Sequence, residues 1–217
     1  NWKFSYGTST KILPEAIIYP DSFLLLVTTT AFPYFDFVPN RVAVSGLSST
    51  ALTNGGQSIL LQDSSGNVIH SLRYSLDWYA NTDKDDGGYS IEQIDPSNIC
   101  GDIDNWRASV GEIGGTPGSR NSVNASNPDT QPPVLERVIY VNPTTIQAFF
   151  SEKLDSLDAI DITNFGIDNG IGSPLSAFPL WPGLTTVTLT LSQPLELHVI
   201  YTLTAYSNLK DCAGNSQ

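Results

Sequence analysis

The sequence predicts an all-β protein, and three observations lead to that prediction. Turn-forming residues are frequent, with 17 glycines and 14 prolines, whereas charged residues make up only 15% of the chain. Strand-length apolar stretches recur about every ten residues, with turn residues between them. In one of these stretches, 185–191, small polar and apolar side chains alternate with a period of two from Thr186 onward. Short alternating segments at such spacing are typical of β-sandwiches and β-barrels.

Eight strands are expected, because eight runs of the sequence are rich in β-branched, aromatic or aliphatic residues. In chain order they are 23–29, 58–62, 68–74, 89–94, 134–141, 145–150, 185–191 and 201–205.

Two of these predictions are specific enough to check residue by residue. An Asp-Ser-Ser-Gly-Asn turn joins 58–62 to 68–74, which predicts a hairpin. Within 185–191, the period of two predicts that Val187, Leu189 and Leu191 point into a core. Helix is expected only as a turn within 156–164.

The chain is expected to form two domains, 1–123 and 133–217, with a linker at 124–132. The linker segment is polar and ends in consecutive prolines, so it has little to bury and a stiffened end. Both flanking parts are acidic, and 217 residues suffice for two domains.

Charge and composition exclude several classes of protein. The net charge of −12 repels phosphate backbones, so no nucleic-acid partner is expected. No apolar run approaches the roughly 18 residues that a spanning helix needs, so no direct membrane insertion is expected. The two cysteines and two histidines lack the spacing of a zinc site.

The first half resembles the lamin-tail domain as it occurs in bacterial surface proteins. Five motifs carry the resemblance: GGQSILL at 55–61, GNVIHSLRY at 66–74, GYSIE at 88–92, NW at 105–106 and GGTPG at 114–118. The resemblance implies an immunoglobulin-like (Ig-like) β-sandwich that is non-catalytic and belongs to a secreted or surface-exposed polypeptide.

The second half is similar to the bacterial Ig-like domains of surface-layer and adhesin-like proteins. The similarity rests on PPV at 132–134, FSEKL at 150–154, YTLT at 201–204 and DCAGN at 211–215. Together the two resemblances imply two Ig-like β-sandwiches in tandem, as in large exported bacterial proteins.

Each domain departs from its family pattern in one respect. The lamin-tail pattern has strands before the tryptophan that corresponds to Trp2, and the Ig-like pattern has a further strand after Gln217. A sandwich that lacks strands leaves backbone donors and acceptors unpaired at a sheet edge. We therefore expect a strand from another domain of the same polypeptide, or from a surface protein, to complete the open edge.

An acidic stretch suggests a calcium site. Asn81, Asp83, Asp85, Asp86 and Glu92 partly follow the ligand spacing of a calcium loop. The sixth position is occupied by an aspartate where such a loop needs glycine, so a solvated acidic loop is the alternative. No cofactor is expected to be required, and Ca²⁺ is the one ion that this stretch suggests.

Cys100 and Cys212 both lie in turn-like sequences, one in each domain. They either form a disulfide, as the tandem-array resemblance suggests, or stay separate thiols. Three further aromatic residues, Trp78, Tyr79 and Trp181, are candidates for a surface that stacks on sugar rings. The alternative is that each packs against its own loop.

No pattern of residues indicates an enzyme: a nucleophile elbow, a phosphate-binding loop and a Cys/His pair are all missing. The predicted function is a non-catalytic structural or interaction segment, a spacer or adhesive array, of a large exported bacterial protein. The predicted location is extracellular or at the surface of a Gram-negative cell, whose outer membrane would carry the parent protein. The alternatives are a calcium-dependent glycan-binding module and an accessory domain of a secreted hydrolase or nuclease.

Overall fold

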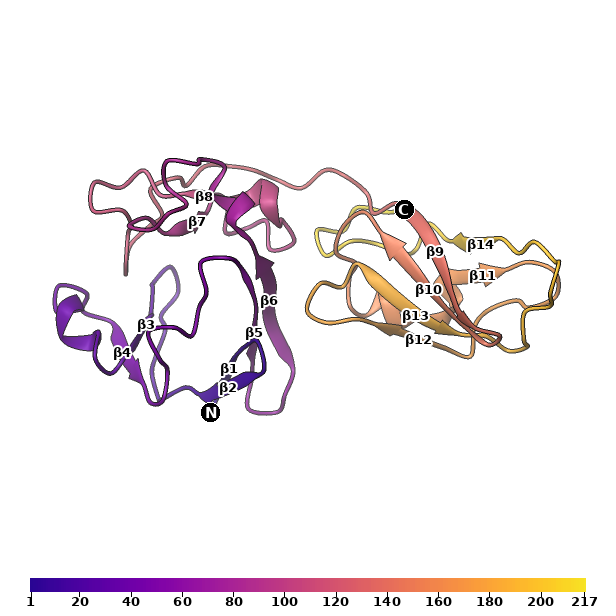
Figure 1. Cartoon of the computed structure of the whole chain (residues 1–217), viewed down its shortest axis with the longest axis horizontal. Coiled ribbons are helices and arrows are strands. Elements are labelled where there is room, and N and C mark those ends of the chain that lie inside the picture. Colours follow the sequence, from indigo (N-terminus) through magenta and orange to yellow (C-terminus); the bar gives the residue numbers. More distant parts are fainter. The chain divides into compact units, whose positions relative to one another are not determined.

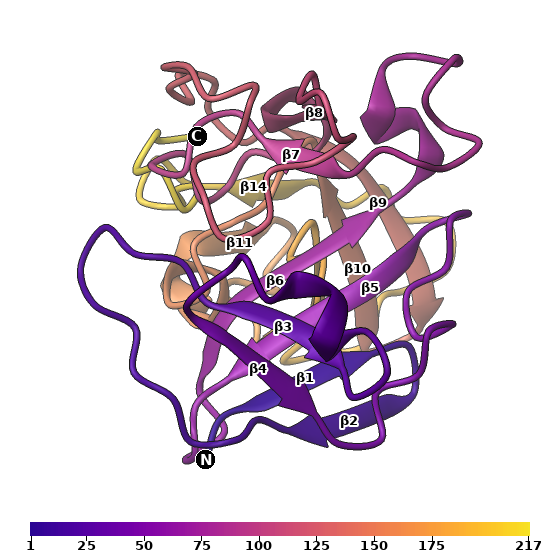
Figure 2. The same cartoon turned by 90° about the vertical axis from the view of Figure 1, so that its left-hand side faces the viewer.

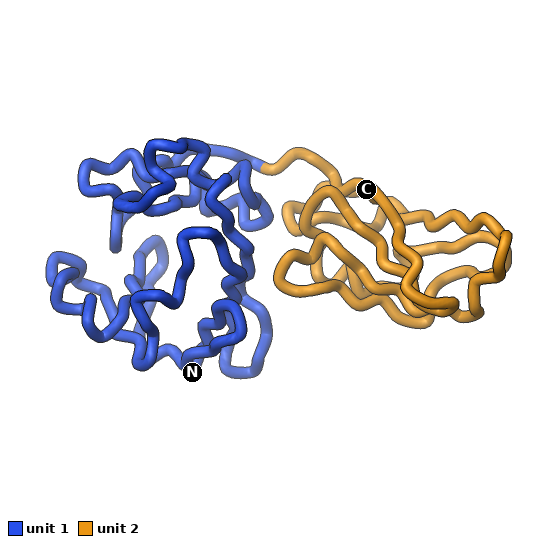
Figure 3. Tube along the Cα trace, in the orientation of Figure 1, with its two compact units in different colours: residues 1–128 blue, residues 129–217 orange.

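A computed structural model describes all residues from 1 to 217 and confirms the all-β prediction. The chain contains 14 strands and five short 3-10 helices, without an α-helix (Figure 1). It divides into two compact units, Asn1–Pro128 (unit 1) and Asp129–Gln217 (unit 2) (Figure 3). None of its helices has the length and apolar character that crossing a bilayer requires.

Unit 1 is built on a four-stranded antiparallel sheet in the order β2-β1-β5-β6 (Figure 2). The strands of this sheet are β1 Lys3–Tyr6, β2 Ser9–Ile12, β5 Gln57–Gln62 and β6 Val68–Tyr74. Two pairs accompany it: parallel β3 Leu25–Thr28 and β4 Arg41–Val44, and antiparallel β7 Ile91–Gln93 and β8 Trp106–Ala108. The 3-10 helices of this unit are η1 Phe32–Phe35, η2 Leu76–Tyr79 and η3 Ile103–Asn105.

The hairpin of β5 and β6 forms as the sequence predicts. The backbone N–H of Asp63 donates to the carbonyl of Asn67 at 2.9 Å, which closes the turn. The Asp63 carboxylate accepts from the backbone N–H groups of Ser65 and Asn67, both at 2.8 Å. Gly66 has a φ of +94°, a backbone conformation in which a residue with a Cβ atom would be strained.

The sheet of unit 1 ends in β2 on one side and β6 on the other, and neither strand pairs further. The parallel strands β3 and β4 pair only with each other. Figure 2 shows this pair in front of the four-stranded sheet. Unit 1 therefore presents several strand edges whose backbone groups no other strand of the chain covers.

Unit 2 is a two-layer arrangement. One layer is an antiparallel sheet in the order β12-β13-β10-β9, and the other is the antiparallel pair β11 and β14. The strand bounds are β9 Leu135–Asn142, β10 Thr145–Phe150, β11 Phe165–Ile167, β12 Ser176–Pro179, β13 Thr186–Thr190 and β14 Leu203–Ala205. The expected helical turn forms two 3-10 turns, η4 Asp158–Ile160 and η5 Ile162–Asn164.

The core of unit 2 lies between these two layers. Val187, Leu189 and Leu191 are at most 2% exposed, which confirms that this alternating segment faces inward. They belong to one apolar cluster with Phe165 of β11 and Ile146 of β10, and side chains of β14 pack against it. Unit 2 is thus a small sandwich that closes its own core.

All eight expected strands are found, with small shifts at their ends, but six others were not expected. These are β1, β2, β4, β8, β11 and β12. Each is only three or four residues long, so it shows too few periods of alternation to stand out in the sequence. Tertiary pairing rather than local pattern makes these segments strands.

Candidate metal centre

Unit 2 brings three carboxylates together at one site. Asp129 lies at the start of the unit, Glu152 follows the end of β10, and Asp211 lies in the turn after β14. One oxygen of each carboxylate lies within 4.8 Å of the others. The bridge between Leu154 and Asp211 holds the second and third segments side by side.

Asp211 is the fixed member of this carboxylate cluster, with only 1% of its surface exposed. Its Oδ1 accepts from the backbone N–H of Asn215 and its Oδ2 from the Asn215 side-chain amide, both at 2.8 Å. The same amide donates to the backbone carbonyl of Asp129 at 3.4 Å. The DCAGN turn thus positions one carboxylate and reaches a second segment of the cluster.

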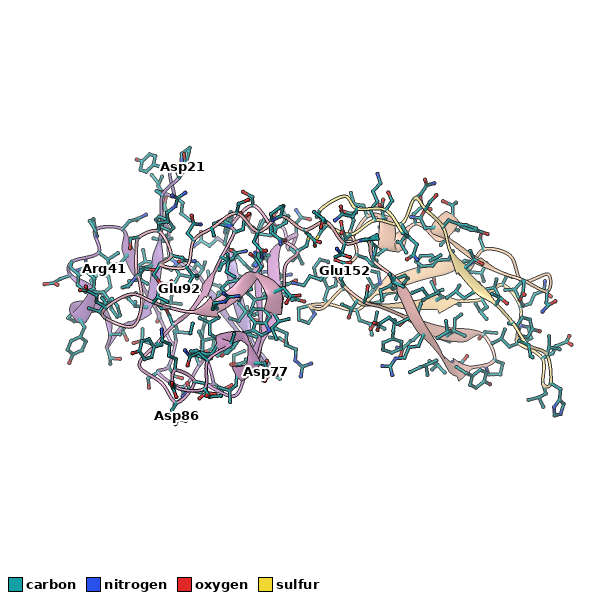
Figure 4. The ribbon with its side chains drawn as sticks, turned by 90° about the horizontal axis from the view of Figure 1, so that it is seen from above. Asp21, Arg41, Asp77, Asp86, Glu92 and Glu152 are labelled. Atoms are coloured by element: carbon teal, nitrogen blue, oxygen red, sulfur yellow. The ribbon has the colours of Figure 1, made fainter.

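The negative charge of Glu152 is disfavoured in this cluster. Burial, together with repulsion from Asp129 and Asp211, raises the pKa of Glu152 from 4.5 to about 7. Figure 4 labels Glu152 within unit 2. Three oxygen donors of negative charge are the ligand type of hard cations such as Ca²⁺, so these residues could hold one.

The residues that the sequence suggested for calcium are arranged differently. Asn81 accepts, through Oδ1, from the backbone N–H of Asp83 at 2.9 Å, which is a local turn contact. The structure does not gather Asp83, Asp85, Asp86 and Glu92 into one set of ligand atoms. Figure 4 shows Asp86 at the periphery of unit 1 and Glu92 inside it. Calcium binding by this loop stays a prediction.

Glu92 has a structural environment of its own. It is 4% exposed, and its Oε1 accepts from the Thr116 hydroxyl at 2.6 Å. Its Oε2 accepts from the hydroxyl and the backbone N–H of Ser122, at 2.6 and 2.7 Å. Burial alone would raise the pKa of Glu92, but these hydrogen bonds outweigh it and lower the pKa.

The candidate sugar-stacking residues divide into two groups. Trp78 and Tyr79 lie on η2 and are buried, so they do not form an exposed platform, and their part in binding a sugar stays a prediction. The cause of the burial is η2 itself, which turns Trp78 onto Trp106 with 5.5 Å between the ring centroids. Trp181 is 42% exposed, in agreement with a surface position.

Neither cysteine is a free thiol in the structure, because Cys100 and Cys212 are both disulfide-bonded. The side chain of Cys100 is buried within unit 1.

The sequence did not predict the carboxylate cluster, although two of its residues lie in motifs that carry the Ig-like similarity. Glu152 belongs to FSEKL and Asp211 to DCAGN, whereas Asp129 lies in the segment expected as a linker. The three residues are far apart in the chain, so no spacing rule links them. The only sign of the cluster in the sequence is that the FSEKL and DCAGN motifs each contain an acidic residue.

Comparisons with solved structures find similarity to a bacterial S-layer protein. The structure titled "Crystal structure of the S-layer protein rSbsC(31-844)" is 31% identical over 39% of this chain and 12% of that chain, with a TM-score of 0.35. The structure of the N-terminal part of the bacterial S-layer protein SbsC is 32% identical over 39% of this chain and 21% of that chain, also with a TM-score of 0.35. The chain therefore matches only a small part of the length of each of these structures. No protein-family model and no curated protein matches the chain.

Proposed function

We propose that this chain is a non-catalytic structural and interaction segment of a large exported bacterial cell-surface protein. Within that protein the two units serve as a spacer or an adhesive array, and we place the parent at the surface of a Gram-negative cell. The observation that carries the proposal is the division into two compact all-β units in series. Many cell-surface domains have a β-sandwich architecture.

Three further features support an exported location. Both cysteines are disulfide-bonded, and disulfides persist mainly in oxidising compartments outside the cytosol. The net charge of −12 favours solubility at an exposed surface. The sequence motifs of the two halves resemble those of lamin-tail and Ig-like domains in exported bacterial proteins.

The interaction part of the proposal rests on the strand edges of unit 1. Because β2, β3, β4 and β6 each have a side without a strand partner, another extended segment could pair there by backbone hydrogen bonds. We propose that this segment comes from another domain of the parent polypeptide or from a neighbouring surface protein.

Protease shaving of intact source cells tests the location. Brief trypsin treatment followed by mass spectrometry should release peptides of this chain while a cytosolic marker protein stays intact. Peptides of this chain that appear only after lysis, together with those of the marker, would contradict a surface location.

Calcium also stays a proposal, and the chain offers two places for it. The acidic loop around Asp83 provides one, and the cluster of Asp129, Glu152 and Asp211 provides the other. Scanning calorimetry in millimolar Ca²⁺ and in chelator tests for binding, because an ion that binds only the folded chain raises its stability. A gain that Glu152→Gln abolishes and Asp83→Asn preserves assigns the ion to unit 2, and the reverse assigns it to the loop. Equal melting curves in both media would exclude both places.

A further inference from the structure

Unit 1 contains a pocket that the structural role does not use. It has a volume of about 280 Å³ and lies between the β5–β6 hairpin, η2, the β7–β8 pair and the turn that precedes β5. Its lining consists of Leu52, Thr53, Asn54, Ile59, Leu72, Tyr74, Trp78, Tyr79, Ile91 and Trp106. Four of these ten side chains are aromatic, which is a high share for one small pocket.

The aromatic wall is held in place by the fold. Trp78 and Trp106 pack on each other with 5.5 Å between centroids and an interplanar angle of 34°. Tyr74 is fixed by donating its hydroxyl to the carbonyl of Thr53 at 2.7 Å, and Tyr79 by donating to the carbonyl of Tyr89 at 3.0 Å. Rings that are already immobilised lose little conformational entropy when a ligand stacks on them.

Polar groups interrupt this apolar wall at defined points. Trp78 lines the pocket and is 5% exposed, and its indole N–H is a hydrogen-bond donor. Asn54 is exposed and also lines the pocket, and its side-chain amide offers both donors and an acceptor. A ligand in the pocket can therefore accept from Trp78 and exchange hydrogen bonds with Asn54.

The lining also limits what the ligand can be. No charged side chain lines the pocket, so the ligand is neutral where it is bound. The volume lies just below the roughly 300 Å³ at which pockets for drug-sized ligands begin, so it suits one ring rather than a chain of rings. A neutral ring with apolar faces and hydroxyl groups on its rim fits both the aromatic wall and the polar points.

From these observations we infer that the pocket of unit 1 binds a single neutral pyranose ring, such as the terminal sugar of a glycan. The ring stacks its C–H face on the aromatic wall, and its oxygens meet the indole N–H of Trp78 and the amide of Asn54. This site differs from the exposed Trp181 and from both candidate cation sites. It adds a binding activity to the proposed structural role and does not depend on it.

Titration of the full chain with defined monosaccharides tests the inference. The probes are methyl β-D-glucopyranoside, methyl β-D-galactopyranoside and methyl N-acetyl-β-D-glucosaminide, and the signals are the indole N–H resonances in ¹H–¹⁵N NMR spectra. At least one probe should shift the Trp78 resonance, assigned through Trp78→Phe, in a saturable manner. The Kd expected for a ligand of about a dozen non-hydrogen atoms is on the order of 1 mM.

Matched variants locate the binding site. Asn54→Trp places a large ring at the pocket and should abolish binding, whereas Ser64→Trp adds the same ring at the exposed far turn of the hairpin and should not. Asn54→Ala should weaken binding roughly fivefold, as expected for one lost hydrogen bond. Trp181→Ala should leave the Kd unchanged. Because Asn54, Ser64 and Trp181 are exposed or partly exposed, these variants should keep the melting temperature of the parent chain.

Three results would overturn the inference. The first is the lack of a saturable shift with all three glycosides at concentrations well above the expected Kd. The second is sugar binding that survives Asn54→Trp but is lost in Trp181→Ala, which would move the site to unit 2. The third is saturable binding of toluene in the same pocket without binding of any sugar, which would make the ligand apolar.

Discussion

The carboxylate of Glu92 accepts hydrogen bonds from both the hydroxyl and the backbone N–H of Ser122, at 2.6 and 2.7 Å. The two residues are 30 positions apart, and Glu92 is buried in β7. A buried carboxylate is tolerated only when hydrogen bonds replace its hydration. Ser122 thus stabilises a buried charge within unit 1.

Removing that hydroxyl should destabilise the protein. We expect Ser122→Ala to lower the free energy of unfolding by about 1.5 to 3 kcal/mol, the range for hydrogen bonds to charged groups. Urea denaturation at pH 7 measures the change. The control is Ser65→Ala, which replaces an exposed serine in the hairpin turn and should change the free energy of unfolding by no more than about 0.5 kcal/mol.

The effect of Ser122→Ala should depend on pH. Because the pKa of Glu92 is lowered by folding, the stability that its charge contributes is present at neutral pH and is lost as pH falls below about 4.5. The difference between parent and Ser122→Ala should therefore shrink in acid, and an undiminished difference at pH 3 would contradict the role of the charge.

Glu152 should give the opposite pH dependence. Its pKa rises from 4.5 in the unfolded chain to about 7 in the folded chain, so the folded state holds the proton more tightly. The stability that this proton provides is present below about pH 4.5, is lost as pH rises to about 7, and does not change further above that. Because Glu152 is only partly buried, we discount the full linkage value to about 1 to 2 kcal/mol.

The corresponding variant is Glu152→Gln, measured in chelator so that no cation neutralises the cluster. At pH 8 it should be more stable than the parent chain by about 1 kcal/mol, because the repulsion by Asp129 and Asp211 is removed. At pH 4.5 the two proteins should differ little. A variant that is less stable than the parent at pH 8 would show that the Glu152 charge is compensated in the folded protein.

Two leucines of unit 2 should respond very differently to truncation. Leu189 of β13 is fully buried in the core cluster, whereas Leu197 is 88% exposed. Leu189→Ala should cost about 2 to 5 kcal/mol through lost burial and the cavity that it leaves. Leu197→Ala should change stability by no more than about 0.5 kcal/mol. Equal effects in thermal or urea unfolding would contradict the assignment of the core.

We predict a disulfide between Cys100 and Cys212, which peptide mapping can test. Proteolysis without reductant should yield a peptide that joins Cys100 to Cys212, and reduction should separate it into two. A link that closes a loop of about 110 residues should contribute about 5 kcal/mol on the chain-entropy model, so Cys100→Ser should lower the midpoint of unfolding. Two thiols that titrate in the untreated, unfolded protein would exclude the link.

The local sequence was sufficient for the elements with several periods of alternation or with a distinctive turn. The β5–β6 hairpin followed from two apolar runs around an Asp-Ser-Ser-Gly-Asn turn, because such a turn can be recognised without knowing the rest of the fold. The inward direction of Val187 and Leu189 followed from the period of two in β13. These features depend on neighbours in the chain, and the sequence contains those neighbours.

Only the tertiary structure decided which distant side chains meet. Asp129, Glu152 and Asp211 become one carboxylate cluster because β10 and the turn after β14 lie side by side, which no spacing in the chain indicates. In the same way, η2 turns Trp78 away from the surface and onto Trp106. The ring of Trp78 therefore lines a pocket and does not form an exposed platform. The sequence by itself determined the all-β class and the direction of the alternating strands, because short-range sterics and burial control both. The composition of each site depended on long-range packing, which acts only once the chain has folded.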